Sequence, residues 1–555
     1  MDRDIDMQDQ HKLRRLSAQD AVYTHTHKQP TSMLASLWSW YISWAIPGLG
    51  MFSEAYIIFS LGLTKPLQKA MFPTCFKTHD ACPEAITHVQ NYIQLCGIIA
   101  GMLAFGALGD YMGRRWGSRI VASIMLSGTI LLTFSPLVPN PATFLNFYIF
   151  AATWYGFGVG GEYPMASASA AERSQSDEAL RHRRGEQVVL TFSGQGMGNF
   201  VNGCVILIMM AWFGMTGPTL DPTKARDVIS IQFAVGAAVS VFMVLWRWFK
   251  LKESEVWEAE KHDFDEITEN ELHKGKRYLT LNAFANFWPR LTATSMAWVA
   301  NDFAFYGNKL FQSTFIALLY PKATEFERMQ WTVLNSAVSL MGYFCAAALI
   351  DKKWYGRCRM QNVGFLMMFV LFLICGVAFP TLTASEAGLR AFQFLYFFSS
   401  FWNQFGPNCT TWLVAAEVFP TDVRGTFQGI SAAMGKVGAI IADIVFGYVS
   451  TRTTFYMSAA FGLAGALVTW LFLPDTTGLS LDELDRMAKY MLSNEFEHYH
   501  GEAVNPKHLS TWERYVLKWH RHYDPEMDRK HKAIQLAKSM GKELSALEKE
   551  VLSKC

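Results

Sequence analysis

The feature that most constrains this chain is a series of about twelve long apolar stretches, since a hydrocarbon core of ~30 Å needs roughly 20 apolar residues per helical span. The stretches are centred near residues 48, 98, 127, 155, 200, 240, 303, 339, 369, 402, 437 and 463. Each is long enough to cross a bilayer. We therefore predict an all-α membrane protein with twelve transmembrane helices.

Polar sequence lies between and around these stretches. Only 17% of the residues are charged, against about 25% in soluble domains. We predict five segments: a disordered cytoplasmic N-terminus (1–33), a six-helix half (34–250), a cytoplasmic central loop (251–287), a second six-helix half (288–474), and a partly helical cytoplasmic tail (475–555).

Basic residues alternate between the two sides of the predicted spans. Clusters of Arg and Lys follow spans two, four, six and eight, at residues 114–119, 173–184, 252–277 and 352–359, whereas the loop 136–141 has none. By the positive-inside rule both termini and the central loop are cytoplasmic. No cleavable signal peptide precedes the first span, and we expect a multi-pass protein of the plasma membrane.

The two halves share repeated motifs. The segment 106–115 (GALGDYMGRR) recurs weakly as 351–357 (DKKWYGR), and Ala-Ala-Glu172 with a following Arg-Gly pair recurs at Glu417. Such repeats are typical of transporters whose halves hold the substrate near the midplane. We expect a structural gate at the cytoplasmic span ends, made of Asp110, Arg114, Glu172, Asp351, Arg357, Glu417 and Arg424.

Four charged residues stand out inside the predicted spans: Glu54, Glu162, Asp302 and Lys436. A charge at mid-span costs about 2.5–3.5 kcal/mol on insertion scales, so such residues are functional candidates by default. Glu54 and Asp302 lie in the first span of each half, and Lys436 lies in span eleven. Polar groups at similar depth in matching helices predict a central cavity.

Span seven carries the most specific pattern. Trp298, Asp302 and Tyr306 are spaced i, i+4, i+8 and so share one helical face. An aromatic wall, a titratable carboxyl and a phenol suit the binding of an anion. Span ten adds Gln404 and Asn408 beside a kink at Gly406-Pro407, and Lys436 is the expected anion partner.

These residues suggest a coupling mechanism. A lysine without a counter-charge is unfavourable in a low dielectric, and an anion would neutralise it. The carboxyl of Asp302 would repel that anion unless it carried a proton, which burial favours. We therefore hypothesise proton–anion symport.

Five motifs point to one family. They are Gly160-Gly161-Glu162-Tyr163-Pro164, the Trp298/Asp302/Tyr306 face with Gly307, Phe405-Gly406-Pro407-Asn408, Glu417-Val418-Phe419-Pro420-Thr421 with Arg424-Gly425, and Ser431-Ala432-Ala433-Met434-Gly435-Lys436. Together they resemble the phosphate:proton symporter branch of the major facilitator superfamily, including fungal phosphate and glycerophosphodiester permeases. The resemblance covers nearly all of residues 37–487.

The resemblance implies functional residues. By analogy, the bound anion is surrounded by Tyr163, Gln195, Trp298, Asp302, Tyr306, Asn408 and Lys436. Protons pass by way of Glu54, Glu162 and Asp302. The phosphate carriers have Asp where this chain has Glu54 and Glu162, and a further Asp where it has Ile57. These departures favour a glycerophosphodiester such as glycerophosphoinositol, with inorganic phosphate or a carboxylate anion as alternatives.

Other classes of function are less well supported. A nutrient receptor that signals through the cytoplasmic tail is one alternative, and the tail could also serve trafficking or ubiquitination machinery. The sequence contains no catalytic triad, P-loop or metal-ligand spacing, so we expect no enzyme, cofactor, metal or nucleic acid. Cys75 and Cys82 share a predicted external loop, and the sequence leaves open whether they form a disulfide.

Overall fold

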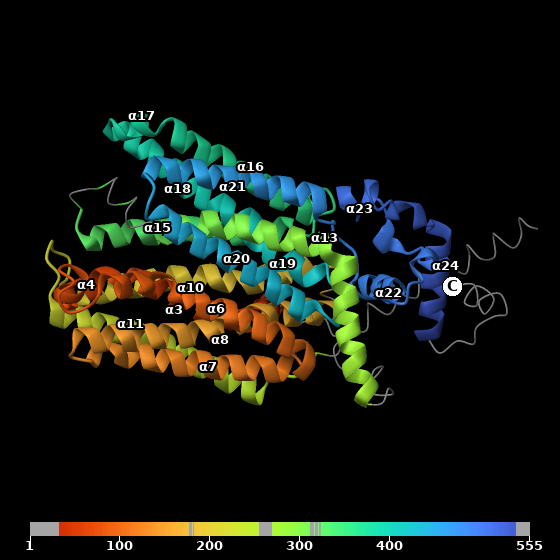
Figure 1. Cartoon of the computed structure of the whole chain (residues 1–555), viewed down its shortest axis with the longest axis horizontal. Helices are drawn as coiled ribbons and strands as arrows, with labels where there is room; N and C mark the ends of the chain where they lie inside the picture. Colours follow the sequence, from red (N-terminus) through yellow and green to blue (C-terminus); the bar gives the residue numbers. More distant parts are fainter. Residues whose placement is uncertain are drawn as a thin grey trace, which may run out of the picture.

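Every regular element that the structure describes is a helix, which confirms the all-α prediction (Figure 1). The structure is a computed structural model that describes residues 33–176, 180, 182–254, 269–310, 316, 320 and 323–539. Residues 1–32 of the predicted disordered segment 1–33, part of the central loop (255–268) and the end of the tail (540–555) lie outside the described residues.

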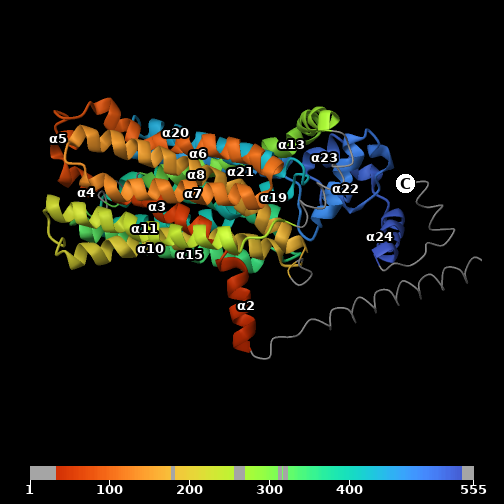
Figure 2. The same cartoon turned by 90° about the horizontal axis from the view of Figure 1, so that it is seen from below.

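The spans run side by side along the long axis of the molecule (Figures 1 and 2). The first half contains α3 (Leu49–Leu63), α6 (Glu84–Met112), α7 (Arg114–Phe134), α8 (Pro141–Ser176), α10 (Arg184–Trp212) and α11 (Pro222–Phe249). The second contains α13 (Glu269–Leu310), α15 (Glu325–Leu349), α16 (Gly356–Val377), α18 (Glu386–Asn403) joined through η2 (Gln404–Asn408) to α19 (Cys409–Glu417), α20 (Arg424–Phe446) and α21 (Thr451–Phe472).

Eight helices among the described residues are long and apolar enough to cross a membrane by themselves. They are α6, α7, α10, α11, α15, α16, α20 and α21. The remaining four spans are the short α3, the long α8 and α13, and the interrupted α18–η2–α19. Helix α3 is apolar but only 15 residues long. Three of these four, α3, α8 and α13, carry the charged residues Glu54, Glu162 and Asp302.

Small residues set the distances between spans. A Cβ added at Gly101 of α6 would lie 2.0 Å from the Phe157 carbonyl oxygen of α8, and one added at Gly160 would lie 2.1 Å from the Ile98 carbonyl oxygen. Close packing at a glycine also joins the two halves, because a Cβ at Gly429 of α20 would lie 2.3 Å from the Met102 carbonyl oxygen of α6. Glycine is therefore required where these backbones touch.

The two ends of the bundle differ in chemistry. At one end, which we call the disulfide end, α4 (Lys65–Met71) and α5 (Pro73–Phe76) lead into α6, and Cys75 is bonded to Cys82. At the opposite end, which we call the basic end, lie the C-terminal helices (Figure 1). Arg114 begins α7, and Arg357, in the first turn of α16, donates to Thr477 of the C-terminal tail at this end. The sequence left open whether Cys75 and Cys82 form a disulfide, and in the structure they do.

Helix α2 (Met33–Ala45) precedes the first span and turns away from the bundle at the basic end (Figure 2). It carries Trp38, Trp40, Tyr41 and Trp44, and Trp38 is 65% exposed. Aromatic side chains of this kind concentrate at membrane–water interfaces. Because α2 ends at Ala45 and α3 begins at Leu49, the apolar stretch predicted around residue 48 is divided between two helices. The first span begins only at Leu49.

Helix α13 begins at Glu269, inside the range predicted as the central loop. Pro289 lies within it, and the helix changes direction where it leaves the bundle (Figure 1). Proline removes a helical hydrogen bond and commonly marks such a bend. The second part of the predicted loop is therefore a helical extension of span seven.

The tail folds into a C-terminal module, residues 475–539, on the basic end. It contains α22 (Leu481–Leu492), η3 (Phe496–His498), η4 (Glu502–Val504), α23 (Thr511–Tyr515), η5 (Trp519–His522) and α24 (Pro525–Ser539). Buried Glu513 accepts from Arg290 of α13 at 2.6 Å, and Asp485 accepts from the backbone of Thr421 at 2.7 Å. The module is anchored to the second half by these contacts.

Candidate functional site

The two charged residues predicted to act together are in direct contact. Lys436 of α20 donates to Asp302 of α13 at 2.8 Å, and the two side chains are 2% and 1% exposed. A Cβ at Gly438 would lie 2.7 Å from the Val299 carbonyl oxygen, so α20 and α13 approach closely here. This close approach brings the ammonium and the carboxylate together at mid-span.

The sequence-based hypothesis that Lys436 has no counter-charge is therefore wrong. Two opposite charges buried in a low dielectric stabilise each other, whereas either one alone carries a large desolvation cost. An anion can reach Lys436 only in competition with Asp302. The coupling hypothesis, which was based on an unpaired lysine, therefore has to be revised.

The first half contributes three buried polar side chains to the same region. Tyr163 of α8 donates to Glu54 of α3 at 3.2 Å, and Gln195 of α10 donates to the Tyr163 hydroxyl at 2.9 Å and to Glu54 at 3.4 Å. The Lys436 ammonium lies 5.1 Å from the centre of the Tyr163 ring, within cation–π range. Trp298 also packs against Tyr163, with ring centroids 6.2 Å apart.

Hydrogen bonds connect these residues across the two halves. The Gln195 side-chain oxygen accepts from Tyr343 at 2.9 Å and from Asn408 at 3.1 Å. Asn301 then donates to Asn408 at 3.2 Å and to Asp302 at 2.9 Å. We call this set the central network: Glu54, Tyr163, Gln195, Tyr343, Asn408, Asn301, Asp302 and Lys436.

Span ten is interrupted where it meets the network. The predicted kink is present as the π-helical turn η2, in which Gly406 has non-helical angles (φ −105°, ψ −105°). The turn places Asn408 against Gln404, whose side-chain oxygen accepts from it at 2.6 Å. π-helical turns are frequent at functional sites because they redirect side chains within a helix.

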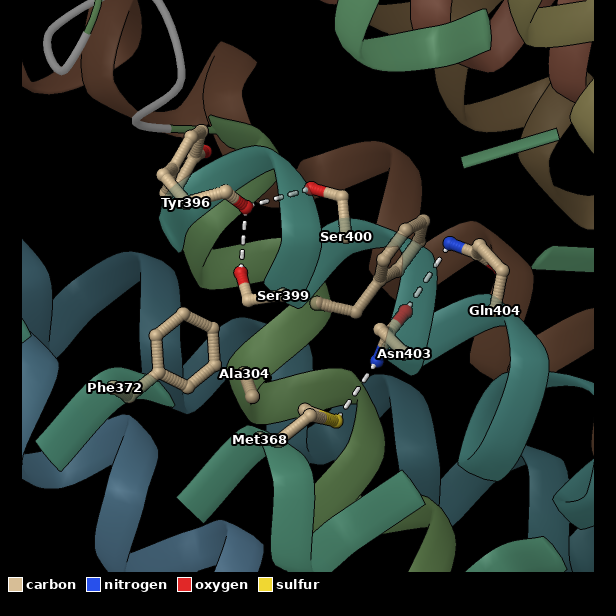
Figure 3. Close-up of a pocket in the computed structure, with 9 residues that line it drawn as sticks. Ala304, Met368, Phe372, Tyr396, Ser399, Ser400, Asn403 and Gln404 are labelled. Atoms are coloured by element: carbon tan, nitrogen blue, oxygen red, sulfur yellow. Dashed lines mark hydrogen bonds between the residues drawn. The ribbon is translucent and has the colours of Figure 1, made fainter. Parts of the chain in front are cut away.

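A small cavity lies beside this turn in the second half (Figure 3). Its volume is about 20 Å³, and Ala304, Met368, Asn403 and Gln404 contribute to its lining. Gln404 donates to Asn403 at 3.1 Å, which in turn donates to Asn301 at 2.9 Å. A cavity of this size accommodates one water molecule next to the network.

Glu162 lies apart from this network. Its carboxylate accepts from both terminal nitrogens of Arg247 in α11, at 2.5 and 2.6 Å, and the Glu162 side chain is fully buried. The two parallel hydrogen bonds of such a bidentate pair fix the relative orientation of the carboxylate and the guanidinium and strengthen their interaction. Glu162 is thus held by a partner that sequence reasoning did not identify, and its predicted function in proton coupling stays a prediction.

The structure brings six of the seven predicted substrate residues together: Tyr163, Gln195, Trp298, Asp302, Asn408 and Lys436. The side chain of the seventh, Tyr306, lies outside the described part of the chain. Sequence reasoning missed Tyr343, Asn301 and Asn403. The only sequence signal for these residues is that each is polar and lies inside an apolar span. This signal is weaker for a tyrosine or an amide than for a charged residue.

The residues predicted as a gate form two clusters at the basic end. In the first, Arg114 pairs with Asp110 at 2.9 Å and with Glu172 at 3.0 Å, and Arg424 from the other half pairs with Glu172 at 3.1 Å. Asp110 also accepts from the backbone nitrogens of Gly425 and Thr426 at the start of α20, at 3.0 and 2.7 Å.

The second cluster repeats this plan with the halves exchanged. Arg357 pairs with Asp351 at 2.8 Å and with Glu417 at 3.1 Å, and Arg184 pairs with Glu417 at 2.7 Å. Asp351 accepts from the backbone nitrogens of Gly185 and Glu186 at the start of α10. Carboxylates are favourable at helix N-termini. Both clusters therefore join the two halves at the basic end.

Replacing Glu417 by Gln should lower the melting temperature by about 5 °C or more, because removing one partner of a buried pair is strongly destabilising. Here the change weakens the partners of two arginines. Thermal unfolding of the purified protein in detergent measures the effect. Glu386→Gln is the control, since Glu386 pairs with Arg390 on the surface, with both side chains at least 75% exposed, and exposed pairs contribute little. Equal shifts for both variants would contradict the structural importance of the cluster.

The sequence matches the profile of the sugar (and other) transporter family over residues 45–488. The chain belongs to this family. The match includes all twelve spans and both gate clusters. As predicted, the protein is a multi-pass membrane transporter of the major facilitator superfamily and not an enzyme.

Members of this family with curated descriptions include plant phosphate transporters. The probable inorganic phosphate transporter 1-12 of Oryza sativa subsp. japonica is 29% identical over 508 residues, which are 80% of this chain and 92% of the relative. The probable inorganic phosphate transporter 1-6 of Arabidopsis thaliana is 29% identical over 489 residues, with 79% and 92% coverage. These relatives confirm the predicted resemblance to the phosphate-transporter branch.

Solved structures support the fold. The proton:xylose symporter XylE, bound to 6-bromo-6-deoxy-D-glucose, superposes with a TM-score of 0.62 at 17% identity, covering 81% of this chain and 99% of XylE. A partially occluded inward-open conformation of the xylose transporter XylE gives 0.59 at 17% identity, covering 79% of this chain and 99% of that chain. At this identity the similarity concerns the fold of the superfamily alone.

Proposed function

We propose that the family member described here is a proton-coupled symporter that imports a phosphate-bearing anion by alternating access, with inorganic phosphate as the first candidate. The observation that carries the proposal is the buried Asp302–Lys436 pair at the junction of the two halves. We also propose that the basic end faces the cytoplasm, because Lys and Arg predominate in the loops there.

The proposed coupling uses competition for Lys436. While Asp302 is ionised, it occupies the ammonium and excludes an anion. A proton on Asp302 removes that competition, and Lys436 then binds the substrate. Loss of the proton on the cytoplasmic side restores the ion pair and releases the substrate. One proton and one anion thus enter the cycle together.

The central network connects two carboxylates, one in each half. Glu54 is the acidic residue at its other end, connected through Tyr163, Gln195 and Asn408 to Asn301 and Asp302. Hydroxyl groups can both donate and accept, and amides fix the orientation of their neighbours. We propose Glu54 and Asp302 as the two titrating ends, and Glu162 as a structural neighbour.

The sequence differs from the phosphate carriers at Glu54 and Glu162, and these differences suggested a phosphodiester. Two observations favour inorganic phosphate instead. The first is that the relatives named above are inorganic phosphate transporters. The second is that Glu162 binds Arg247, so its extra methylene does not alter the central network. Glu54 remains a departure within the network, and a glycerophosphodiester is the second candidate.

Uptake assays in cells lacking their own carriers would test the substrate. Labelled inorganic phosphate, a glycerophosphodiester and a dicarboxylate are each supplied at acidic and at neutral external pH. We expect phosphate accumulation that increases several-fold at acidic pH and is abolished by a protonophore. Accumulation of the dicarboxylate alone, or uptake independent of the proton gradient, would refute the proposal.

A receptor that signals without transport is the rival from another class. In such a receptor, the folded C-terminal module would provide the surface for signalling. Counterflow in proteoliposomes separates the two functions, because a pure receptor exchanges no labelled anion. Equal labelled phosphate in protein-containing and protein-free vesicles would favour the receptor.

A further inference from the structure

A second cavity lies at the basic end, entirely within the first half. Its volume is about 480 Å³, and its lining comes from α2, the turn before α3, α7, α8, α11 and the segment that follows α11. Every lining residue lies between positions 42 and 254. The lining includes Arg114 of the first gate cluster but no residue of the central network. Since the substrate of this fold is held between the two halves, this cavity is distinct from the candidate substrate site.

The lining of this cavity is amphiphilic. Ile46, Met165 and Trp246 provide apolar walls, while Arg173, Lys250 and Lys252 provide positive charge. The one acidic residue among the lining side chains, Glu253, accepts from the backbone nitrogens of Arg114 and Arg115 at 2.8 and 3.0 Å, which directs it to the start of α7. An excess of positive charge therefore remains.

The surrounding aromatic residues indicate the depth of the cavity in a membrane. Trp116 and Trp248 are 49% and 43% exposed and enclose Arg119, whose guanidinium lies 5.0 and 5.4 Å from their ring centres. Exposed tryptophans prefer the headgroup region. The aromatic helix α2, which contributes Ile42 and Ser43 to the lining, lies at the same end. The cavity is thus placed at the level of lipid headgroups.

We infer that this cavity binds the phosphate headgroup of an acidic phospholipid, with Lys250 and Lys252 as its main cationic contacts and the apolar wall beside the acyl chains. Lysines near an anionic lipid surface attract it by charge, and acyl chains suit Ile46 and Met165. The inference depends on the proposed orientation only in assigning the lipid to the cytoplasmic leaflet.

Lipid retention by the purified full-length protein tests the inference without any transport measurement. The protein in detergent is titrated with phosphatidylinositol or with phosphatidylcholine, and bound lipid is counted by native mass spectrometry. We expect preferential retention of phosphatidylinositol. The double variant Lys250→Gln/Lys252→Gln should bind it about 30-fold more weakly, as expected for two lysines near an anionic surface. Both lysines are exposed, so the variant should fold normally.

The matched control is Lys352→Gln/Lys353→Gln, which removes two exposed lysines at the same end of the other half. It should retain phosphatidylinositol as the unmodified protein does. A loss equal to that of the first variant would refute the cavity as the site, as would unchanged binding in both. Ser169→Trp fills the cavity without changing its charge, and it should also reduce retention. Displacement of the lipid by inorganic phosphate would identify a soluble anion as the ligand and overturn the inference.

Discussion

Replacing Asp302 by Asn is expected to reduce proton-driven accumulation to the level of protein-free vesicles while anion binding persists. The amide cannot carry the transported proton, and it no longer competes as a charge for Lys436. Substrate should then neutralise a lysine that would otherwise be buried alone, so binding should be as strong as before or stronger. Accumulation under a pH gradient and counterflow at equal pH, in the same proteoliposomes, measure the two properties separately.

The control for this variant is Asp443→Asn, which removes a half-buried carboxyl of α20 outside the central network. It should keep most of the accumulation. If Asp302→Asn lost counterflow as completely as accumulation, while phosphate failed to raise its melting temperature, Asp302 would be needed for anion binding itself and not only for coupling. Accumulation that survived in Asp302→Asn would refute the coupling scheme outright.

Replacing Lys436 by Gln is expected to weaken phosphate binding about 100-fold or more, because the bound anion loses its charged partner, and truncating one partner of a buried hydrogen-bonded charge pair costs about 2–5 kcal/mol. Both accumulation and counterflow should fail, in contrast to Asp302→Asn. Isothermal titration or a phosphate-dependent shift in melting temperature measures the loss.

The double variant Asp302→Asn/Lys436→Gln distinguishes charge from packing. It removes both members of the pair, so it should recover stability relative to Lys436→Gln without recovering binding. Lys65→Gln, at the disulfide end of the first half, is the single-charge control and should bind phosphate normally. Normal binding in Lys436→Gln would remove the lysine from the proposed site.

The order of the spans could be predicted from the sequence because each span must provide enough apolar length by itself. The prediction was less accurate where amphipathic and apolar helices adjoin. Residues near 48 were one apolar stretch in the sequence but form the end of α2, a turn and the start of α3. Likewise, α13 extends into the predicted loop. These boundaries depend on where a helix meets the membrane interface, which hydropathy does not report.

Sequence analysis could predict only those site residues that are clearly polar within an otherwise apolar span. Asp302 and Lys436 are such residues, but their mutual distance depends on the close approach of α13 and α20. The partner of Glu162 was missed because Arg247 lies near the end of its span, shortly before the basic residues assigned to orientation. Tyr343 was missed because a tyrosine is common in membrane helices and is identified as polar only by its hydrogen bonds.

Arg424 contacts two parts of the molecule, the first half and the C-terminal module. Its guanidinium contacts Glu172 of the first half at 3.1 Å and Asp485 of the C-terminal module at 3.8 Å. In the proposed alternating-access cycle, parting of the halves would break the first contact and leave the second. A carboxylate would then stay beside the arginine throughout the movement, which would lower the barrier between the two forms. We therefore propose that the module affects the rate of transport without contacting the substrate.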